Sequence, residues 1–291
     1  MKELKQITVI GLGLLGGSIT LAILRSFSKI KVVGYSHRLE TRQKAAKLAG
    51  ASEIVDDLKT SVSNADLVIL ATPISTFEEI LEQIVDKLPK GCIVTDVGST
   101  KVYPHRWAAD KLPQTVYYVG SHPIAGSEQR GVEFARDDLF DNALCILTTT
   151  QKTNSQAIKT LKKFWSKIGC LVQLMSPARH DKIFANVSHL PHILAACLVN
   201  ANNTEMLKFA GKGFIDSSRI ASGPANIWTD VLLTNSDNLT EGIDKIIAEL
   251  LKFRKAIKTE NRKNIEALLE KARTTRAALM NYKMRKKEII S

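Results

Sequence analysis

The chain has 291 residues, of which 44% are hydrophobic and 24% are charged, and its formal net charge is +12. This composition excludes a disordered, fibrous or disulfide-rich chain, and the length predicts two domains or one large α/β unit. The positive charge suits anionic small molecules as well as nucleic acid, so it does not decide between them.

No apolar run approaches the roughly 20 residues that span a membrane, and the N-terminus enters a strand-like segment without the pattern of a signal peptide. We therefore expect a cytoplasmic protein with no membrane partner. The four cysteines are widely spaced and form no CxxC pair, which argues against a zinc site and a disulfide framework. We interpret all four as small packing residues: Cys92, Cys145, Cys170 and Cys197.

Strand-like and helix-like segments alternate regularly through the first part of the chain. This alternation predicts a Rossmann-like α/β domain, with a doubly wound, mostly parallel sheet covered by helices on both faces. Ser75 and Glu78 fit a capping box at the start of one helix. The predicted strands cover residues 7–13, 31–35, 65–73, 92–99, 115–123, 143–150 and 170–175, and the predicted helices cover residues 18–27, 41–50, 75–88 and 155–168.

Long helical patterns replace this alternation after residue 177. The sequence therefore predicts a dinucleotide-binding domain over residues 1–177 and an all-helical domain over residues 178–291. Residues 180–202 are apolar enough for a buried helix, and apolar stripes over 238–257 and 260–284 predict an antiparallel pair. Because these helices present more apolar surface than one small domain can cover, we expect a homodimer through the helical domain.

The segment GLGLLG fits the G-x-G-x-x-G pattern and follows a predicted strand at the opening of a predicted helix. Gly11 makes the tight turn, Gly13 lets a pyrophosphate approach the backbone, and Gly16 packs the helix on the strand. The helix N-terminus, at Leu14 and Leu15, faces the phosphates. In this context the pattern predicts a dinucleotide site, although such glycines alone can simply tighten a turn.

The end of the second strand lacks the Asp or Glu that usually binds the ribose 2′-hydroxyl of NAD. Ser36, His37 and Arg38 stand there instead, and Thr41 lies nearby at the start of the next helix. A hydroxyl, an imidazole and a guanidinium group suit a 2′-phosphate, so the sequence favours NADP over NAD, with NAD still possible.

Three further loops follow predicted strands, at residues 71–73, 96–101 and 120–128. In a doubly wound sheet such loops line one crevice with the glycine loop, so Thr72 and Pro73 are expected to contact the cofactor. The convergence also favours a functional over a structural role for His122, because a neutral histidine near its ordinary pKa is suited to accept a proton.

Five motifs occur in a fixed order: GLGLLGGS, DVGSTK, GSHPIAGSE, SHLPH and SRIASGPANIW. Together they resemble the prephenate/arogenate dehydrogenase family of tyrosine biosynthesis, over about residues 6–275. The combination of HPIAGSE with HLPH is specific, whereas the glycine fingerprint occurs in other dehydrogenases as well. No segment resembles a chorismate mutase or an ACT domain, so the chain is similar to the short monofunctional form.

The resemblance implies oxidative decarboxylation of the dicarboxylate prephenate to 4-hydroxyphenylpyruvate, with a hydride passing from C4 to NADP and the ring carboxylate leaving as CO2. Arogenate dehydrogenase, which gives tyrosine directly, and a dual-specificity cyclohexadienyl dehydrogenase stay open as alternatives. The two substrates differ only in a pyruvyl or an alanyl side chain, and Glu128, if it points inward, would pair with the ammonium group of arogenate.

The same resemblance implies the roles of individual residues. His122 accepts the proton of the ring hydroxyl, and Ser99 is its hydrogen-bonding companion. Arg219 binds a substrate carboxylate, for which its planar fork is suited. The other residues implied in the substrate pocket are Ser127, Glu128, Ser188, His192 and Trp228.

Three other kinds of function have some support in the sequence: a metal site, another type of oxidoreductase, and a non-enzymatic nucleotide or nucleic-acid binder. Ser188, His189 and His192 mimic the spacing of a metal pair, but no third ligand follows at a suitable distance and hydride transfer needs no metal, so we expect none. A two-domain β-hydroxyacid oxidoreductase is the second alternative, but we do not identify in residues 180–192 the catalytic lysine expected on a helix of its second domain. A nucleotide sensor or nucleic-acid binder has the basic tail, residues 273–287, as its main support, and such a tail is more often a solvated helix end. We therefore expect no nucleic-acid partner.

Overall fold

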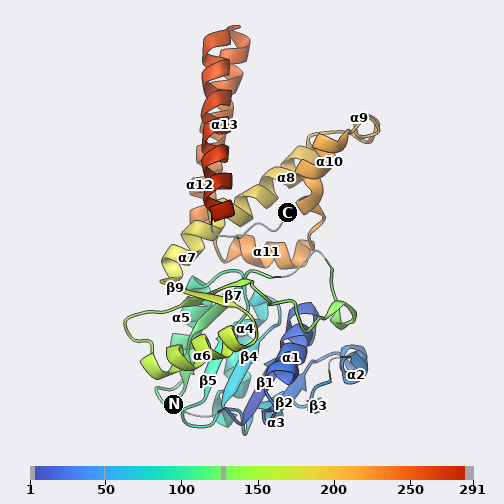
Figure 1. Cartoon of the computed structure of the whole chain (residues 1–291), viewed down its shortest axis with the longest axis vertical. Coiled ribbons are helices and arrows are strands. Elements are labelled where there is room, and N and C mark those ends of the chain that lie inside the picture. The colour runs from blue at the N-terminus through green and yellow to red at the C-terminus, as the bar shows by residue number, and fades with distance from the viewer. Residues whose placement is uncertain (1–3, 49, 126–128, 286–291) are drawn as a thin grey trace. The chain divides into compact units, whose positions relative to one another are not determined.

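The computed structural model describes residues 4–48, 50–125 and 129–285. A six-stranded parallel sheet with the order β3-β2-β1-β4-β5-β6 forms the centre of the first part of the chain (Figure 1). Its strands are β1 (Gln6–Ile10), β2 (Lys31–Tyr35), β3 (Glu53–Val55), β4 (Leu67–Leu70), β5 (Ile93–Asp96) and β6 (Tyr117–Tyr118). The strand order reverses between β1 and β4, which is where ligands bind in open α/β sheets.

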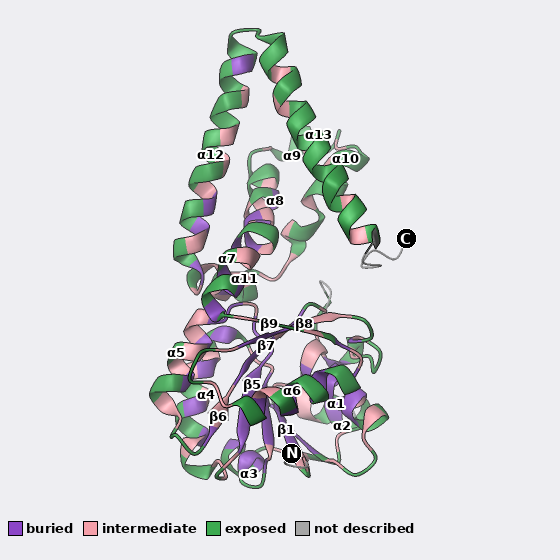
Figure 2. Ribbon diagram, turned by 60° about the vertical axis from the view of Figure 1, so that its left-hand side comes forward, coloured by how far each residue is buried: buried purple, intermediate pink, exposed green. Residues whose placement is uncertain are grey.

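Helices cover both faces of this sheet, as the alternating pattern predicted. One face packs on α1, α2 and α6 through a core around Val9, Ile23 and Phe164, and the other packs on α3, α4 and α5 around Val68 and Phe77. Buried residues therefore run along the strands and the inner helix faces (Figure 2). The bounds are α1 (Leu14–Ser26), α2 (Leu39–Leu48), α3 (Leu58–Val62), η1 (Ile74–Thr76), α4 (Phe77–Ile84), η2 (Val85–Lys87), α5 (Val102–Lys111), η3 (Val132–Phe134) and α6 (Ser155–Lys167).

A second sheet of three strands contains β7 (Gly120–Pro123), β8 (Leu144–Thr148) and β9 (Leu171–Met175). β7 is antiparallel to β8, and β9 is parallel to β8. The single strand predicted over residues 115–123 is therefore two short strands that belong to different sheets. The chain changes partner at Val119, whose N–H still bonds to Val94 before β7 pairs with β8.

A long helical stretch follows, consisting of α7 (Pro177–Phe184), the π-helical turn η4 (Ala185–His189) and α8 (Leu190–Asn200). Pro191 explains the wider turn, because proline lacks an N–H and its ring clashes with the carbonyl four residues earlier. The remaining short elements are α9 (Thr204–Leu207), α10 (Lys212–Ser218), η5 (Arg219–Ser222) and α11 (Ala225–Leu233).

The stretch Pro177–Asn200 is long and apolar enough to cross a membrane by length and composition alone, a test that core helices of soluble proteins also pass. Asp181, His180 and His189 on it are buried, and such polar groups are costly in a bilayer. The stretch is less buried than its apolar sequence led us to expect: Val187 and Leu198 expose their side chains. Cys197 is exposed too, in contrast to the other three cysteines.

The chain divides into two compact units by packing, one ending at Leu239 and the other starting at Thr240. The boundary falls within α12 (Ser236–Lys258), which a turn at Glu260 connects to α13 (Arg262–Arg285). The two long helices run in opposite directions (Figure 2). Residues 177–239 therefore belong to the same compact unit as the sheets. The sequence pattern changes earlier, at residue 177, from alternating strands and helices to helices alone. The domain boundary at that residue remains a prediction from secondary structure.

Candidate active site

The glycine loop connects β1 to α1. Gly11 has φ +99°, which favours glycine, and a Cβ there would lie 2.6 Å from the carbonyl oxygen of Ala71. A Cβ at Gly16 would lie 1.8 Å from the carbonyl oxygen of Gly11, so the third glycine is needed where the helix approaches the strand. At Gly13 a Cβ would meet no atom of the described residues within 4 Å. The backbone at Gly13 is therefore open to a ligand, beside the first-turn amides of α1.

The turn after β2 carries Ser36, which is buried, and His37 and Arg38, which are exposed. Arg42, on the first turn of α2 next to the half-buried Thr41, donates from Nη1 to the carbonyl oxygens of Ser36 (2.8 Å) and His37 (3.1 Å). This guanidinium group fixes the turn and adds positive charge to it. The sequence analysis did not single out Arg42.

The loop after β4 lies against the glycine loop, as the close approach of Ala71 to Gly11 requires. In this loop Thr72 Oγ1 is 2.7 Å from Thr76 Oγ1, and the Thr76 hydroxyl also donates to the carbonyl of Pro73 at 2.7 Å. The predicted capping box is not formed, because the Ser75 hydroxyl instead donates to Asp230 Oδ2 on α11 at 2.6 Å. The loop after β4 is thereby connected to α11.

His122 lies on β7 and is half-buried. Its Nδ1 is 2.8 Å from Nε2 of His180, and Nδ1 of His180 is 2.7 Å from Oδ1 of Asp181. The Asp181 carboxylate also accepts the backbone N–H groups of Lys101 (2.7 Å) and Val102 (2.8 Å), where α5 begins. A row of three side chains therefore leads from the predicted base to a helix N-terminus.

A buried ion pair lies beneath this row. The Lys101 ammonium group is fully buried, pairs with Asp96 and donates to the carbonyl of Ser121 at 2.6 Å. Tyr118 donates its hydroxyl to Asp96 Oδ2 at 2.6 Å, and the N–H of Gly98 donates to Oδ1 at 2.7 Å. Since Ser121 precedes His122, these bonds fix the start of β7 and hence the position of the imidazole.

Burial sets the protonation states of these groups. It lowers the pKa of His122 well below its usual range, and the positive charge of Lys101 lowers that pKa further. Burial and Lys101 likewise lower the pKa of His180 strongly. Burial raises the pKa of Asp181, against the opposing effect of the Val102 and Lys101 N–H groups. Both imidazoles of the row are therefore neutral at neutral pH, which a proton acceptor requires. The expectation that the pKa of His122 stays near its ordinary value was wrong, because the ring is desolvated by burial.

A second group of rings lies on η4, α8 and α11. His192 stacks on Trp228 with ring centroids 3.6 Å apart and an interplanar angle of 11°. Gly223 makes room for this pair, since a Cβ there would lie 2.3 Å from Nε1 of Trp228. Asn235 Nδ2 donates to the carbonyl of Asp181 at 2.8 Å and lies 3.1 Å from Nδ1 of His189, which connects this group to the row at His122.

Two of these buried imidazoles have unused polar atoms. Within the described ranges, Nε2 of His189 and Nδ1 of His192 are buried and have no hydrogen-bond partner. Because Asn235 donates to Nδ1 of His189, the remaining proton of that neutral ring is on Nε2. A buried N–H without an acceptor is costly, so this corner of the site is suited to a polar ligand.

The other residues implied in the pocket stand as follows. Ser99 follows β5 and is half-buried. Among the described residues its hydroxyl forms no hydrogen bond to His122, whose Nδ1 pairs with His180. Ser188 is half-buried on η4. Arg219 is exposed at the start of η5, an element that packs on α8. Ser127 and Glu128 lie outside the described residues.

Sequence reasoning did not assign a role to His180, Asp181, Lys101 or Asn235. His180 and Asp181 stand at the start of a helix that its apolar sequence predicts to be buried. Two adjacent polar residues in such a helix could have indicated a functional role. Lys101 belongs to the DVGSTK motif, which the sequence analysis placed at the site without giving the lysine a role.

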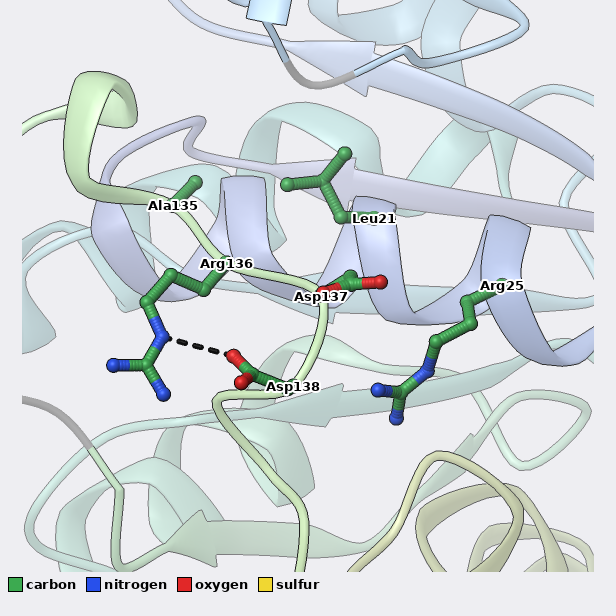
Figure 3. Close-up of a pocket in the computed structure, with 6 residues that line it drawn as sticks. All are labelled: Leu21, Arg25, Ala135, Arg136, Asp137 and Asp138. Carbon is green, nitrogen blue, oxygen red and sulfur yellow. Dashed lines mark hydrogen bonds and ion pairs between the residues drawn. The ribbon is translucent and has the colours of Figure 1, made fainter.

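A hollow at the surface elsewhere contains charged side chains but none of the predicted site residues (Figure 3). Leu21 and Arg25 of α1 line it with residues 135–138, and Arg136 donates to Asp138 within it at 2.8 Å. Arg25 pairs with Asp141. Both arginines of the hollow therefore already have carboxylate partners, so it is a weaker candidate for an anionic ligand than the predicted crevice at the strand ends. Among the described residues no group of three or more His, Cys, Asp or Glu side chains is arranged to hold a metal ion.

Comparisons with known proteins agree with this geometry. The family model "Prephenate dehydrogenase, nucleotide-binding domain" matches residues 19–174, and "Prephenate dehydrogenase, dimerization domain" matches residues 176–271. Prephenate dehydrogenase of Bacillus subtilis is 36% identical over 96% of this chain and 77% of its own length. Cyclohexadienyl dehydrogenase of Zymomonas mobilis is 32% identical over 90% of this chain and 91% of its own length.

Among solved structures, the prephenate dehydrogenase of A. aeolicus in complex with hydroxyphenyl propionate and NAD+ is similar to this chain with a TM-score of 0.89. The two are 32% identical, and the alignment covers 96% of this chain and 99% of that one.

Proposed function

Since the chain belongs to the prephenate dehydrogenase family and is a nicotinamide-dependent dehydrogenase, we propose that it catalyses the oxidative decarboxylation of prephenate to 4-hydroxyphenylpyruvate with NADP as the hydride acceptor. The observation that carries this proposal is the neutral, half-buried imidazole of His122 on β7, a strand that contacts the C-terminal part of β5 through Ser121 and Thr95.

The residues present fit the cofactor. The open backbone at Gly13, the tight turn at Gly11 and the first-turn amides of α1 suit a pyrophosphate. When bound, the nicotinamide supplies the acceptor for the hydride of C4. The chain's own residues then have to orient the substrate and handle the proton of its ring hydroxyl.

In the proposed reaction His122 accepts the C4 hydroxyl proton while the C–H bonding pair leaves C4 as hydride. The bond between C1 and the ring carboxylate breaks and CO2 leaves. The electron pair of that bond stays with the ring and makes it aromatic. The phenolate oxygen that results takes the proton back from His122. Arg219 binds a carboxylate of the substrate, and the unused N–H of His189, with His192 and Trp228, supports a polar ligand beside it.

Two findings support NADP over NAD. The turn at Ser36, His37 and Arg38 offers no carboxylate to repel a 2′-phosphate, and Arg42 adds a second guanidinium group to the same turn. Arogenate, or the use of both substrates, is the alternative choice of substrate, and the Zymomonas mobilis relative carries the broader name cyclohexadienyl dehydrogenase.

Steady-state kinetics of the purified protein tests this proposal in four combinations, with prephenate or arogenate and with NADP or NAD. We expect the highest kcat/KM with prephenate and NADP. A higher value with arogenate would reverse the substrate assignment, and a higher value with NAD would reverse that of the cofactor.

We also propose a cytoplasmic homodimer formed through residues 178–291, consistent with the dimerization-domain match and with the apolar side chains exposed on α12 and α13.

A further inference from the structure

We propose that His180 and Asp181 are positioning residues that hold His122 in one tautomer, with the proton on Nδ1 and the lone pair on Nε2, so that Nε2 is the atom that accepts the substrate proton. This inference rests on the proposed role of His122 as the base. It assigns functions to two residues that lie 58 and 59 positions further along the chain.

The hydrogen bonds at Asp181 have a fixed direction. Its Oδ1 faces the backbone N–H of Lys101 at 2.7 Å, and its Oδ2 faces that of Val102 at 2.8 Å. Backbone N–H groups can only donate, and together with the nearby Lys101 ammonium they favour the carboxylate against the opposing effect of burial. Nδ1 of His180, 2.7 Å from Oδ1, therefore donates to Asp181.

The tautomers of both histidines follow from this direction. His180 is fully buried and neutral, so with its proton on Nδ1 it has a lone pair on Nε2. That nitrogen lies 2.8 Å from Nδ1 of His122 and can only accept, so Nδ1 of His122 donates to it. His122 is neutral as well, and its Nε2 is then left unprotonated. An isolated imidazole would instead exchange between the two tautomers.

Packing fixes the planes of these rings as well as their protons. The Phe184 ring stacks on His180 with centroids 4.4 Å apart and contacts His122 with centroids 4.8 Å apart. Asn235 holds the carbonyl of Asp181 from the other side. A base that is oriented in advance does not have to be ordered during the reaction, and the imidazolium that forms keeps a hydrogen bond directed toward a carboxylate.

Nitrogen NMR of the wild-type protein with 15N-labelled histidine tests the assignment without any turnover. We expect His122 and His180 each to have a protonated Nδ1 and an unprotonated Nε2 at neutral pH. A protonated Nε2 on His122 would overturn the proposal. Because this readout needs no substrate, it remains decisive even if the chain oxidises neither prephenate nor arogenate, a result that would end the proposed function instead.

A pair of variants at His180 separates positioning from mere packing. The amide oxygen of His180→Gln can still accept from Nδ1 of His122, whereas His180→Leu fills a similar space with no acceptor. We expect kcat of the leucine variant to fall by about 100-fold, within the range for loss of general-base catalysis, with KM nearly unchanged, and the glutamine variant to recover most of that loss. Equal kcat in the two variants, each folded by its thermal transition, would contradict the proposal.

Discussion

The imidazole of His122 is the group on which the proposed chemistry depends most directly. His122→Asn keeps a side-chain donor toward His180 but cannot accept a proton at neutral pH. We expect kcat to fall by about two to four orders of magnitude, while the dissociation constant for NADP, measured by fluorescence titration, stays nearly unchanged. A variant with near-normal kcat would remove His122 from the mechanism.

Arg38 is exposed at the turn after β2, where a 2′-phosphate is expected. Arg38→Ala should raise KM for NADP by about tenfold to a hundredfold, as loss of a charged hydrogen bond worth about 1.5–3 kcal/mol requires, and leave KM for NAD nearly unchanged. Lys47→Ala, at the other end of α2, removes the same charge and serves as the control. If both cofactors weaken equally in the Arg38 variant, the guanidinium group does not recognise the 2′-phosphate.

Arg219, at the start of η5, is expected to bind a carboxylate of the substrate. Arg219→Ala should raise KM for prephenate by about tenfold to a hundredfold with a smaller change in kcat, because a ground-state ion pair is lost. Lys212→Ala on the neighbouring α10 controls for the loss of positive charge. An unchanged KM in steady-state assays would show that the assignment is wrong.

The junction of β5 and α5 depends on the buried pair of Lys101 and Asp96. Lys101→Met leaves the Asp96 carboxylate without its counter-charge, so we expect the free energy of unfolding, measured with urea, to fall by about 3–5 kcal/mol. The double variant Lys101→Met, Asp96→Asn removes both charges and should recover part of that loss. A single variant within about 1 kcal/mol of wild type would mean that the pair contributes little to stability.

Elements with a local signal could be predicted from the sequence. Most of the strands and helices up to residue 175 follow from the spacing of apolar residues, but the short elements β3 and α3 and the helix α5 were not among the predicted segments. Gly11, Gly13 and Gly16 could be predicted because all three lie in the single turn that they shape. The split of the strand over residues 115–123 could not be predicted, because both halves have the same alternation and only their partner strands differ.

The row from His122 to Asp181 depends on contacts between distant elements. β7 provides the first residue, α7 provides the other two, and the N-terminus of α5 provides the donors to Asp181. No periodicity within the sequence encodes such a contact. The family motifs implied Ser99 as the hydrogen-bonding partner of His122, whereas in the structure the imidazole pairs with His180.

For the whole molecule, we expect a homodimer, since many large apolar side chains on α12 and α13 are exposed in the single chain. Light scattering at micromolar concentration should give twice the chain mass, and a variant with Leu250→Lys and Leu251→Lys should reduce it. A monomer mass for the wild type would refute this. The residues concerned are Ile247, Leu250, Leu251, Ile257, Leu269 and Leu279.

The 58-residue separation between His122 and His180 has a consequence for the order of events during protein synthesis. A ribosome releases the glycine loop and β7 well before α7, and domains fold as the chain emerges. The nucleotide site can therefore take shape while the imidazole of His122 still lacks its partner. Closing that long loop is among the later steps of folding, so we expect the growing chain to acquire a cofactor site before it acquires an oriented base.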